Sequence, residues 1–327
     1  MCINTIDFNE YMYLFVSTTA KHKSSILRLP DRELSNGKSL NYLITNEEYA
    51  VELFKQVDGL IPTVIIDAEL KQDIDLFSIA KKYIKKSSIY MNKPNDLTME
   101  SADVLLQQHF DRELIGKKAL IIGTGNISFK LALRLAERNV QVFIDGRNAS
   151  KVTKVVETIN MILPAYSKYK VKKFELNCFD GGLDAVIPFV SAEKVVPDSY
   201  AVLLHEFSIS VDGGIGNFSE EYIAVALKKK SKVIRLDVRI ALPFANASLK
   251  TLSPSFSFFE NISGERMIEN MNIVAGGIIG SEGTIIVDQI KNPQQIIGVA
   301  NGYGGVKHEN TLSAGERSRI EKLREKL

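Results

Sequence analysis

Residues 117–128 read Lys-Lys-Ala-Leu-Ile-Ile-Gly-Thr-Gly-Asn-Ile-Ser. The continuous apolar run before Gly123 is typical of a strand that is buried in a parallel sheet. Gly123 allows a sharp turn after that strand, and Gly125 leaves the backbone open to the approach of a pyrophosphate. We therefore predict that the turn from Gly123 to Ser128 binds a phosphate group at the start of a helix.

The residues after this turn complete a short β-α-β unit. Residues 129–138 carry apolar side chains near helical spacing, and residues 140–145 read Val-Gln-Val-Phe-Ile-Asp, which is typical of a second strand. A strand before the turn and a helix after it are the context in which this glycine pattern binds a dinucleotide in a Rossmann-type domain. The predicted pyrophosphate-binding residues are Gly123, Gly125, Asn126 and Ile127. The alternative is a Rossmann-like domain that binds another adenosine ligand, as methyltransferases do, or none.

The rest of the chain alternates strand and helix patterns, which predicts a doubly wound α/β sheet. We expect strands at 63–67, 88–91, 184–190, 200–204 and 232–236, and helices at 73–86, from Thr98 onward, and at 149–162. Residues 1–100 then form a smaller α/β N-terminal domain for substrate and catalysis, and residues 101–245 form the Rossmann domain. Residues 246–327 form a Gly-rich segment, closed by a helix from Ser313 to Leu327, that packs on either domain.

The composition is that of an ordinary globular protein. Of the 327 residues, 45% are hydrophobic and 24% are charged, with a net charge of +2 and a pI near 8.3. This balance argues against a nucleic-acid or membrane partner. Two Cys and four scattered His residues give no disulfide framework and no metal-site spacing. The first residues do not resemble a secretory signal, and no apolar run reaches the roughly 18 residues of a membrane helix, so we expect a cytoplasmic protein.

Two residues at the end of the second strand favour different cofactors. Asp145 lies 20 residues beyond Gly125, where an acid accepts hydrogen bonds from the adenosine ribose of NAD. Arg147 follows two positions later and can bind the 2′-phosphate of NADP with two hydrogen bonds. The simplest alternative for Arg147 is a surface residue in a turn. From these residues alone the choice between NAD and NADP stays open.

The same region resembles the shikimate dehydrogenase type of Rossmann domain. Those enzymes carry Asn-Arg-Thr-x-x-Lys after the second strand. Arg147 and Lys151 match this motif, whereas Gly146 and Asn148 replace its Asn and Thr. The resemblance implies that Arg147 serves NADP, while Asp145 keeps NAD as the alternative.

Residues 211–216, Val-Asp-Gly-Gly-Ile-Gly, are similar to the Asp-Val-Gly-Ile loop near the cofactor of methylene-tetrahydrofolate dehydrogenases. Both families belong to the amino-acid-dehydrogenase-like superfamily, and the match covers residues 90–240 at the superfamily level. The resemblance implies an N-terminal catalytic domain before the Rossmann domain, with the active site in the cleft between them.

The resemblance also suggests catalytic residues. Shikimate dehydrogenases use a Lys and an Asp, and their Asp lies in an Asn-Thr-Asp segment before the Rossmann strand. Asp96 lies at about that position, although it equally suits the first turn of a helix. Lys71, after the predicted strand at 63–67, is the candidate lysine and Lys93 is the second choice. A surface lysine is the simplest description of either.

We therefore expect an NAD(P)-dependent oxidoreductase, with NADP preferred, that acts on a small polar metabolite in the interdomain cleft. The alternative is a non-redox Rossmann-like protein, either a methyltransferase or a nucleotide-binding regulator. His205, directly after the predicted strand at 200–204, is either an acid-base group or a loop residue. No arginine pair or aromatic cage in the sequence identifies the substrate. The expected partner is a small molecule, and a homodimer is the assembly to test.

Overall fold

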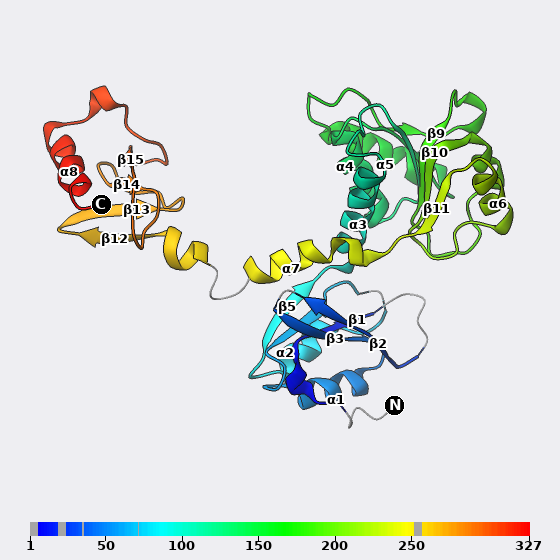
Figure 1. The fold of residues 1–327 in the computed structure, drawn as a ribbon, viewed down its shortest axis with the longest axis horizontal. Helices are drawn as coiled ribbons and strands as arrows, with labels where there is room; N and C mark the ends of the chain where they lie inside the picture. The colour runs from blue at the N-terminus through cyan, green and yellow to red at the C-terminus, as the bar shows by residue number, and fades with distance from the viewer. Residues whose placement is uncertain (1–5, 19–23, 35, 71, 252–256) are drawn as a thin grey trace. The chain divides into compact units, whose positions relative to one another are not determined.

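A computed structural model describes residues 6–18, 24–34, 36–70, 72–251 and 257–327. The chain divides into two compact units, Met1–Asn246 and Ala247–Leu327. The first unit contains two sheets with hydrophobic cores of their own, and the second contains a smaller sheet (Figure 1). All predicted site residues belong to the first unit.

The N-terminal sheet of the first unit is a mixed sheet covered by two helices. Its elements are β1 (Tyr11–Ser17), β2 (Ile26–Leu34), β3 (Gly37–Ile44), α1 (Glu47–Val57), β4 (Thr63–Asp67), α2 (Leu76–Tyr83) and β5 (Ser88–Asn92). The spatial order is β2-β3-β1-β4-β5, in which β2 alone is antiparallel to its neighbour. The amphipathic helices α1 and α2 bury Leu53, Phe54 and Ile79 in one core with the strands.

The second sheet is the doubly wound Rossmann sheet that the sequence predicts. Its strands are β6 (Lys118–Ile122), β7 (Gln141–Asp145), β8 (Lys172–Lys173), β9 (Leu183–Pro188), β10 (Leu204–Asp212) and β11 (Lys232–Arg235). All run parallel, in the order β11-β10-β9-β6-β7-β8 that dinucleotide-binding folds share. The parallel arrangement places the carboxyl ends of all six strands at one edge of the sheet.

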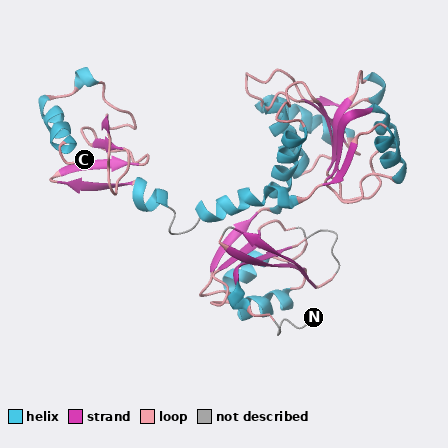
Figure 2. Cartoon of the chain, in the orientation of Figure 1, coloured by secondary structure: helices cyan, strands magenta, loops and turns pink. Residues whose placement is uncertain are grey.

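Helices cover both faces of the Rossmann sheet (Figure 2). They are α3 (Pro94–His109), α4 (Asn126–Glu137), α5 (Ala149–Ile162) and α6 (Glu220–Lys228). Ala119 and Ile121 of β6 belong to the core with α3, α4 and α5, whereas Leu120 and Ile122 belong to the core with α6. Burial on both faces explains why this strand is a continuous apolar run.

Several predicted elements differ from the structure. Helix α3 begins at Pro94, before the predicted Thr98, because the first helical position needs no backbone N–H and so accepts proline. Helix α2 is shorter than predicted, since Asp75 accepts the Ser78 N–H (3.0 Å) and caps it. The predicted strand at 200–204 is wrong: Asp198–Leu203 is a 3-10 helix that packs on α6, and β10 begins only at Leu204.

The second unit is a small α/β body. It contains β12 (Gly264–Ile268), β13 (Met271–Ala275), β14 (Ile285–Val287), β15 (Ile296–Val299) and α8 (Ala314–Arg324). The strands lie in sequence order and bury Ile273 and Ile285 with Leu323 of α8. Ser313 and Glu316 form a capping box at the start of α8, which confirms the predicted C-terminal helix.

The boundary between the two units falls within α7 (Leu242–Thr251). None of the helices in the described ranges combines the length and the apolar character needed to cross a lipid bilayer.

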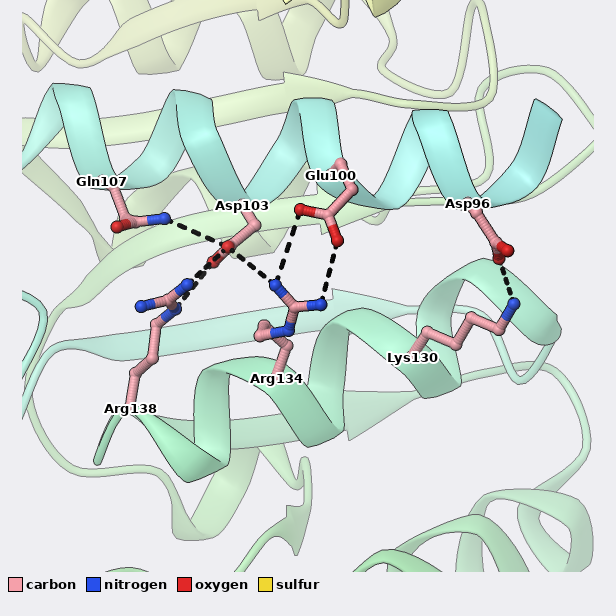
Figure 3. A network of polar contacts seen from close by, with 7 residues as sticks. All are labelled: Asp96, Glu100, Asp103, Gln107, Lys130, Arg134 and Arg138. Atoms are coloured by element: carbon pink, nitrogen blue, oxygen red, sulfur yellow. Dashed lines mark hydrogen bonds and ion pairs between the residues drawn. The ribbon is translucent and has the colours of Figure 1, made fainter. Parts of the chain in front are cut away.

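Helix α3 is fixed on α4 by a polar network centred on Asp103 (Figure 3). The Asp103 side chain is only 2% exposed, and it accepts hydrogen bonds from Arg138 Nε (3.0 Å) and Nη2 (2.8 Å). Arg134 lies between Asp103 and Glu100 and donates to Glu100 Oε1 (2.9 Å). Because α3 follows β5 almost directly, this network fixes the helix that connects the two sheets of the first unit.

We expect Asp103→Ala to lower the free energy of unfolding by about 3 kcal/mol, because removing one member of a buried ion pair leaves the other charge unpaired. Calorimetry of the purified chain measures the change as a fall in Tm. Glu100→Ala is the matched control, because the Glu100 side chain is 23% exposed and its ion pair is worth about 1 kcal/mol or less. Equal falls in Tm would contradict the central role of Asp103.

Candidate functional site

The glycine turn lies at the carboxyl end of β6 and is held by close contacts. Gly123 has φ +124°, a conformation that residues with a Cβ rarely adopt. A Cβ on Gly123 would lie 2.9 Å from Ser128 Oγ and 3.0 Å from the carbonyl oxygen of Phe189. The Gly123 N–H also donates to the carbonyl oxygen of Asp145 (2.9 Å). The turn is therefore tight because three chain segments meet at Gly123.

Gly125, two residues further along the chain, lies beside open space, in contrast to the crowded Gly123. It is the N-cap residue of α4 and makes no side-chain capping hydrogen bond there, and a Cβ on it would meet nothing within 4 Å. Gly125 and Asn126 are exposed, and Ile127 is half-buried. Open space thus lies beside the first amide groups of a long helix, at its positive end. This arrangement fits the pyrophosphate of a dinucleotide.

The end of the second strand holds Asp145 in a defined position. Asp145 Oδ1 accepts the N–H of Gly146 (2.7 Å), and Asp145 Oδ2 accepts the hydroxyl of Tyr200 (2.7 Å). Tyr200 is buried, and burial, together with the Asp145 carboxylate, raises the pKa of its hydroxyl. It therefore stays a donor to Asp145. This contact is not predictable from the sequence, which places Tyr200 in a strand.

Arg147 and Lys151 follow Asp145 at the start of α5. Asn148 caps this helix by accepting the Lys151 N–H (2.9 Å) through its side chain. Both basic side chains are exposed, and within the described ranges neither forms an ion pair. The structure thus brings Arg147 and Lys151 to the strand edge that carries the glycine turn, at the next strand of the sheet.

A cavity of about 620 Å³ lies between the two sheets of the first unit, and we call it the inter-sheet cavity. Its wall comes from the carboxyl-terminal parts of β1, β4 and β5, from β2 and β3, from the first turn of α3, and from the ends of β10 and β11. Polar groups on this wall include Ser17, Asn41, Asn92, Thr98 and Asp212.

Phe189 connects the glycine turn to the inter-sheet cavity. The carbonyl oxygen of Phe189 packs against Gly123, where a Cβ would be too close to it. The ring of Phe189 packs against Gly213, and a Cβ on Gly213 would lie only 2.3 Å from the ring atom Cε1. Gly213 lines the cavity. The glycine turn and the cavity wall are therefore separated by one residue.

The structure describes only one of the two predicted catalytic residues. Lys71 is outside the described residues. Asp96 lies in the first turn of α3 and forms an ion pair with Lys130 of α4 (Figure 3), and it is not part of the cavity wall. Lys93 is the exposed N-cap residue of α3. In the described part of the chain, no three His, Cys, Asp or Glu side chains form a metal-binding group.

His205 lies at the edge opposite to the glycine turn. The expectation that it follows a strand is wrong, because it is the second residue of β10 and therefore lies near the amino end of that strand. Its Nε2 is 3.5 Å from Asp184 Oδ1. Ligands bind at the carboxyl ends of the strands in this fold, so His205 does not belong to the candidate site.

No family model matches the chain. A stretch of 105 residues is 29% identical to an uncharacterized oxidoreductase of Schizosaccharomyces pombe, and it spans 31% of this chain and 31% of that relative. Among solved structures, the chain is similar to a shikimate dehydrogenase in complex with NADP+ (14% identity, 76% of this chain and 92% of that one, TM-score 0.45). It is also similar to an L-tryptophan dehydrogenase from Nostoc punctiforme (14% identity, 78% and 80%, TM-score 0.45).

Gly123 and Gly125 permit a paired test of the turn. We expect Gly123→Ala to cost about 2 kcal/mol or more in stability, because the added Cβ combines a positive φ with a close backbone contact. Gly125→Asp should leave Tm unchanged, since aspartate is a favourable N-cap and the space is open, but it should abolish NADPH binding through charge repulsion. Calorimetry gives Tm, and titration gives Kd. A Gly125→Asp chain with unchanged affinity for NADPH would contradict phosphate binding at this turn.

Proposed function

We propose that this chain is an NAD(P)-dependent oxidoreductase that prefers NADP. The observation that carries the proposal is the glycine turn, where the start of α4, without a side-chain cap, borders open space beside Gly125. Backbone amides and the positive end of a helix dipole suit the diphosphate of a dinucleotide. The name of the partial relative from Schizosaccharomyces pombe agrees with this proposal.

The contacts of Asp145 support NADP over NAD. In an NAD site, the acid after the second strand accepts hydrogen bonds from the ribose hydroxyls. Here each oxygen of the Asp145 carboxylate already accepts a hydrogen bond within the protein, one from Gly146 and one from Tyr200. The exposed guanidinium of Arg147 suits the 2′-phosphate that distinguishes NADP, and Lys151 adds a second positive charge on α5.

We infer that a small polar metabolite binds in the inter-sheet cavity. The volume of about 620 Å³ suits a small molecule, and Phe189 separates the cavity wall from the phosphate-binding turn. When bound, the nicotinamide cofactor exchanges a hydride with its substrate. Asn92 and Thr98, which line the cavity, can orient a substrate hydroxyl or carbonyl by hydrogen bonds.

Lys71 and Asp96 remain predictions for the proton-transfer groups. Since Asp96 is paired with Lys130, it would have to leave that lysine to act as an acid or a base. A homodimer and a cytoplasmic location likewise remain predictions from the sequence.

Thermal shift of the full chain with NADPH, NADH and S-adenosylmethionine tests the proposed function. A ligand at about 100 times its Kd stabilises the folded chain by about 2.7 kcal/mol, so NADPH should raise Tm by several degrees and NADH by less. A rise in Tm with S-adenosylmethionine alone would exclude the redox function in favour of a methyltransferase.

Tyr200→Phe tests the role of Asp145 in cofactor choice. Loss of the hydroxyl leaves one Asp145 oxygen available to a ribose hydroxyl of NADH. We therefore expect the ratio of Kd for NADH to Kd for NADPH to fall about fivefold or more, which corresponds to one hydrogen bond to a charged group. Titration with both cofactors measures this ratio.

Tyr222→Phe is the matched control for Tyr200→Phe. It also removes a buried tyrosine hydroxyl, which lies 2.9 Å from Ser210 Oγ, in the same core but without contact to Asp145. The same change of the ratio in both variants would show that stability, not Asp145, determines it.

A further inference from the structure

Two arginines from different sheets line the inter-sheet cavity. Arg32 lies on β2 of the N-terminal sheet, and Arg235 is the last residue of β11 in the Rossmann sheet. They are far apart in the sequence, and the fold alone brings β2 and β11 to one cavity. No sequence motif predicts this pair of arginines, which is found only in the structure.

Arg32 is half-buried, and within the described ranges no carboxylate forms an ion pair with its guanidinium. Burial lowers the pKa of its guanidinium, the charge of Arg239 lowers it further, and Asp237 acts in the opposite direction. Across the described ranges, the side chains of Arg32 and Arg235 form no hydrogen bond or ion pair. The residues outside those ranges include no Asp or Glu, so they cannot supply an acidic side chain as a partner. The half-buried guanidinium of Arg32 has an unfavourable desolvation energy that an anionic ligand would offset, whereas Arg235 is exposed.

The acidic groups on the cavity wall already have donors. Asp237 accepts hydrogen bonds from Arg239 Nε at 3.0 and 2.9 Å, and these contacts lower the pKa of Asp237 to about 2. The Asp212 carboxylate accepts the backbone N–H groups of Gly214 (3.2 Å) and Gly216 (2.6 Å). The wall thus carries two arginines and two aspartates, and Asp237 acts on Arg32 through its charge. In the described ranges, however, neither acid forms a hydrogen bond or an ion pair with Arg32 or Arg235, and the donors of both arginines stay available to a ligand.

We propose that Arg32, together with Arg235, binds an anionic group of the substrate, either a carboxylate or a phosphate. A planar guanidinium presents a fork of donors that matches both groups. The chain would then act on small anionic metabolites. The description of this anion as a substrate rests on the proposed function, whereas the anion site itself does not.

The rest of the wall fits a compact substrate. Phe15, Leu97 and Ile215 give apolar surface in the same cavity, and Asn92 and Thr98 give uncharged polar groups. The arginines thus bind the charge, and the other groups contact the carbon skeleton and its hydroxyl or carbonyl.

Titration calorimetry of the full chain with malonate, and separately with inorganic phosphate, tests the proposal. NADPH is kept at a saturating concentration so that the glycine turn and Arg147 are already covered. The variants are Arg32→Gln, Arg235→Gln and the control Arg28→Gln. Arg28 lies on the same strand as Arg32, but it is paired with Asp31 (3.0 Å) and does not line the cavity.

Of the two anions, the one that binds the unchanged chain more tightly is used for the comparison. We expect Arg32→Gln to raise its Kd about tenfold or more, because the variant loses at least one charged hydrogen bond. Arg235→Gln should raise it in the same direction, and Arg28→Gln should leave it unchanged. The Tm of ligand-free Arg32→Gln should not fall, because the removed guanidinium forms no hydrogen bond or ion pair within the described ranges. Tighter binding of malonate would identify a carboxylate substrate, and tighter binding of phosphate would identify a phosphorylated one.

Absence of anion binding in a chain that binds NADPH would overturn the anion site, as would equal losses in the Arg28 and Arg32 variants. If the chain does not bind NADPH, the anion titration is repeated without cofactor on the Arg147→Gln variant, so that Arg147 cannot bind the anion. Arg32-dependent anion binding there would support the anion site while the proposed function fails.

Discussion

The close approach of three chain segments at Gly123 is the constraint on which the candidate site depends. The end of β6, the first turn of α4 and the residue after β9 leave no room for a side chain there. Since the turn is this short, α4 starts immediately at the strand edge, and its first amide groups lie beside open space at Gly125. The same contact brings Phe189, and through it Gly213, to the edge of the inter-sheet cavity. A wider turn would separate the start of α4, where we propose that phosphate binds, from the cavity.

The sequence predicts the fold well where a strand or helix is determined by its own burial. Strand β6 has a core on each face, so its residues form a continuous apolar run, and α5 has its predicted bounds because Asn148 caps it and Pro164 follows it. The edge strand β2 has no such signal. Most of its residues are exposed or half-buried, and its pairing with β3 shifts register between Leu29 and Arg32. The apolar residues near Tyr200 are buried as a 3-10 helix, which periodicity does not distinguish from a strand.

The candidate site is predictable to the same limit. Glycines in a turn and an arginine after a strand are local patterns, so the sequence is sufficient to propose Gly123, Gly125 and Arg147. The contacts that decide which cofactor and which substrate such a site would bind are formed by residues far apart in the sequence. Tyr200 reaches Asp145 from across the sheet, and Arg32 reaches the cavity from another sheet. Whether a charged group has a partner is a property of the folded chain, and this property separates Arg32 from the paired Arg28 on the same strand.

The connection between the two sheets has a mechanical consequence. Strand β5 ends at Asn92 and α3 begins at Pro94, so Lys93 alone lies between the N-terminal sheet and a helix that Asp103 fixes to the Rossmann domain. The Asn95 N–H at the start of α3 also donates to the Glu69 carboxylate (3.1 Å), so a rotation of one sheet against the other would have to break this contact or change the few torsions of this short connection. The proline ring fixes one of these torsions and restricts the residue before it. The connection is thus stiff, and any opening of the cavity between the sheets would have to work against these restrictions.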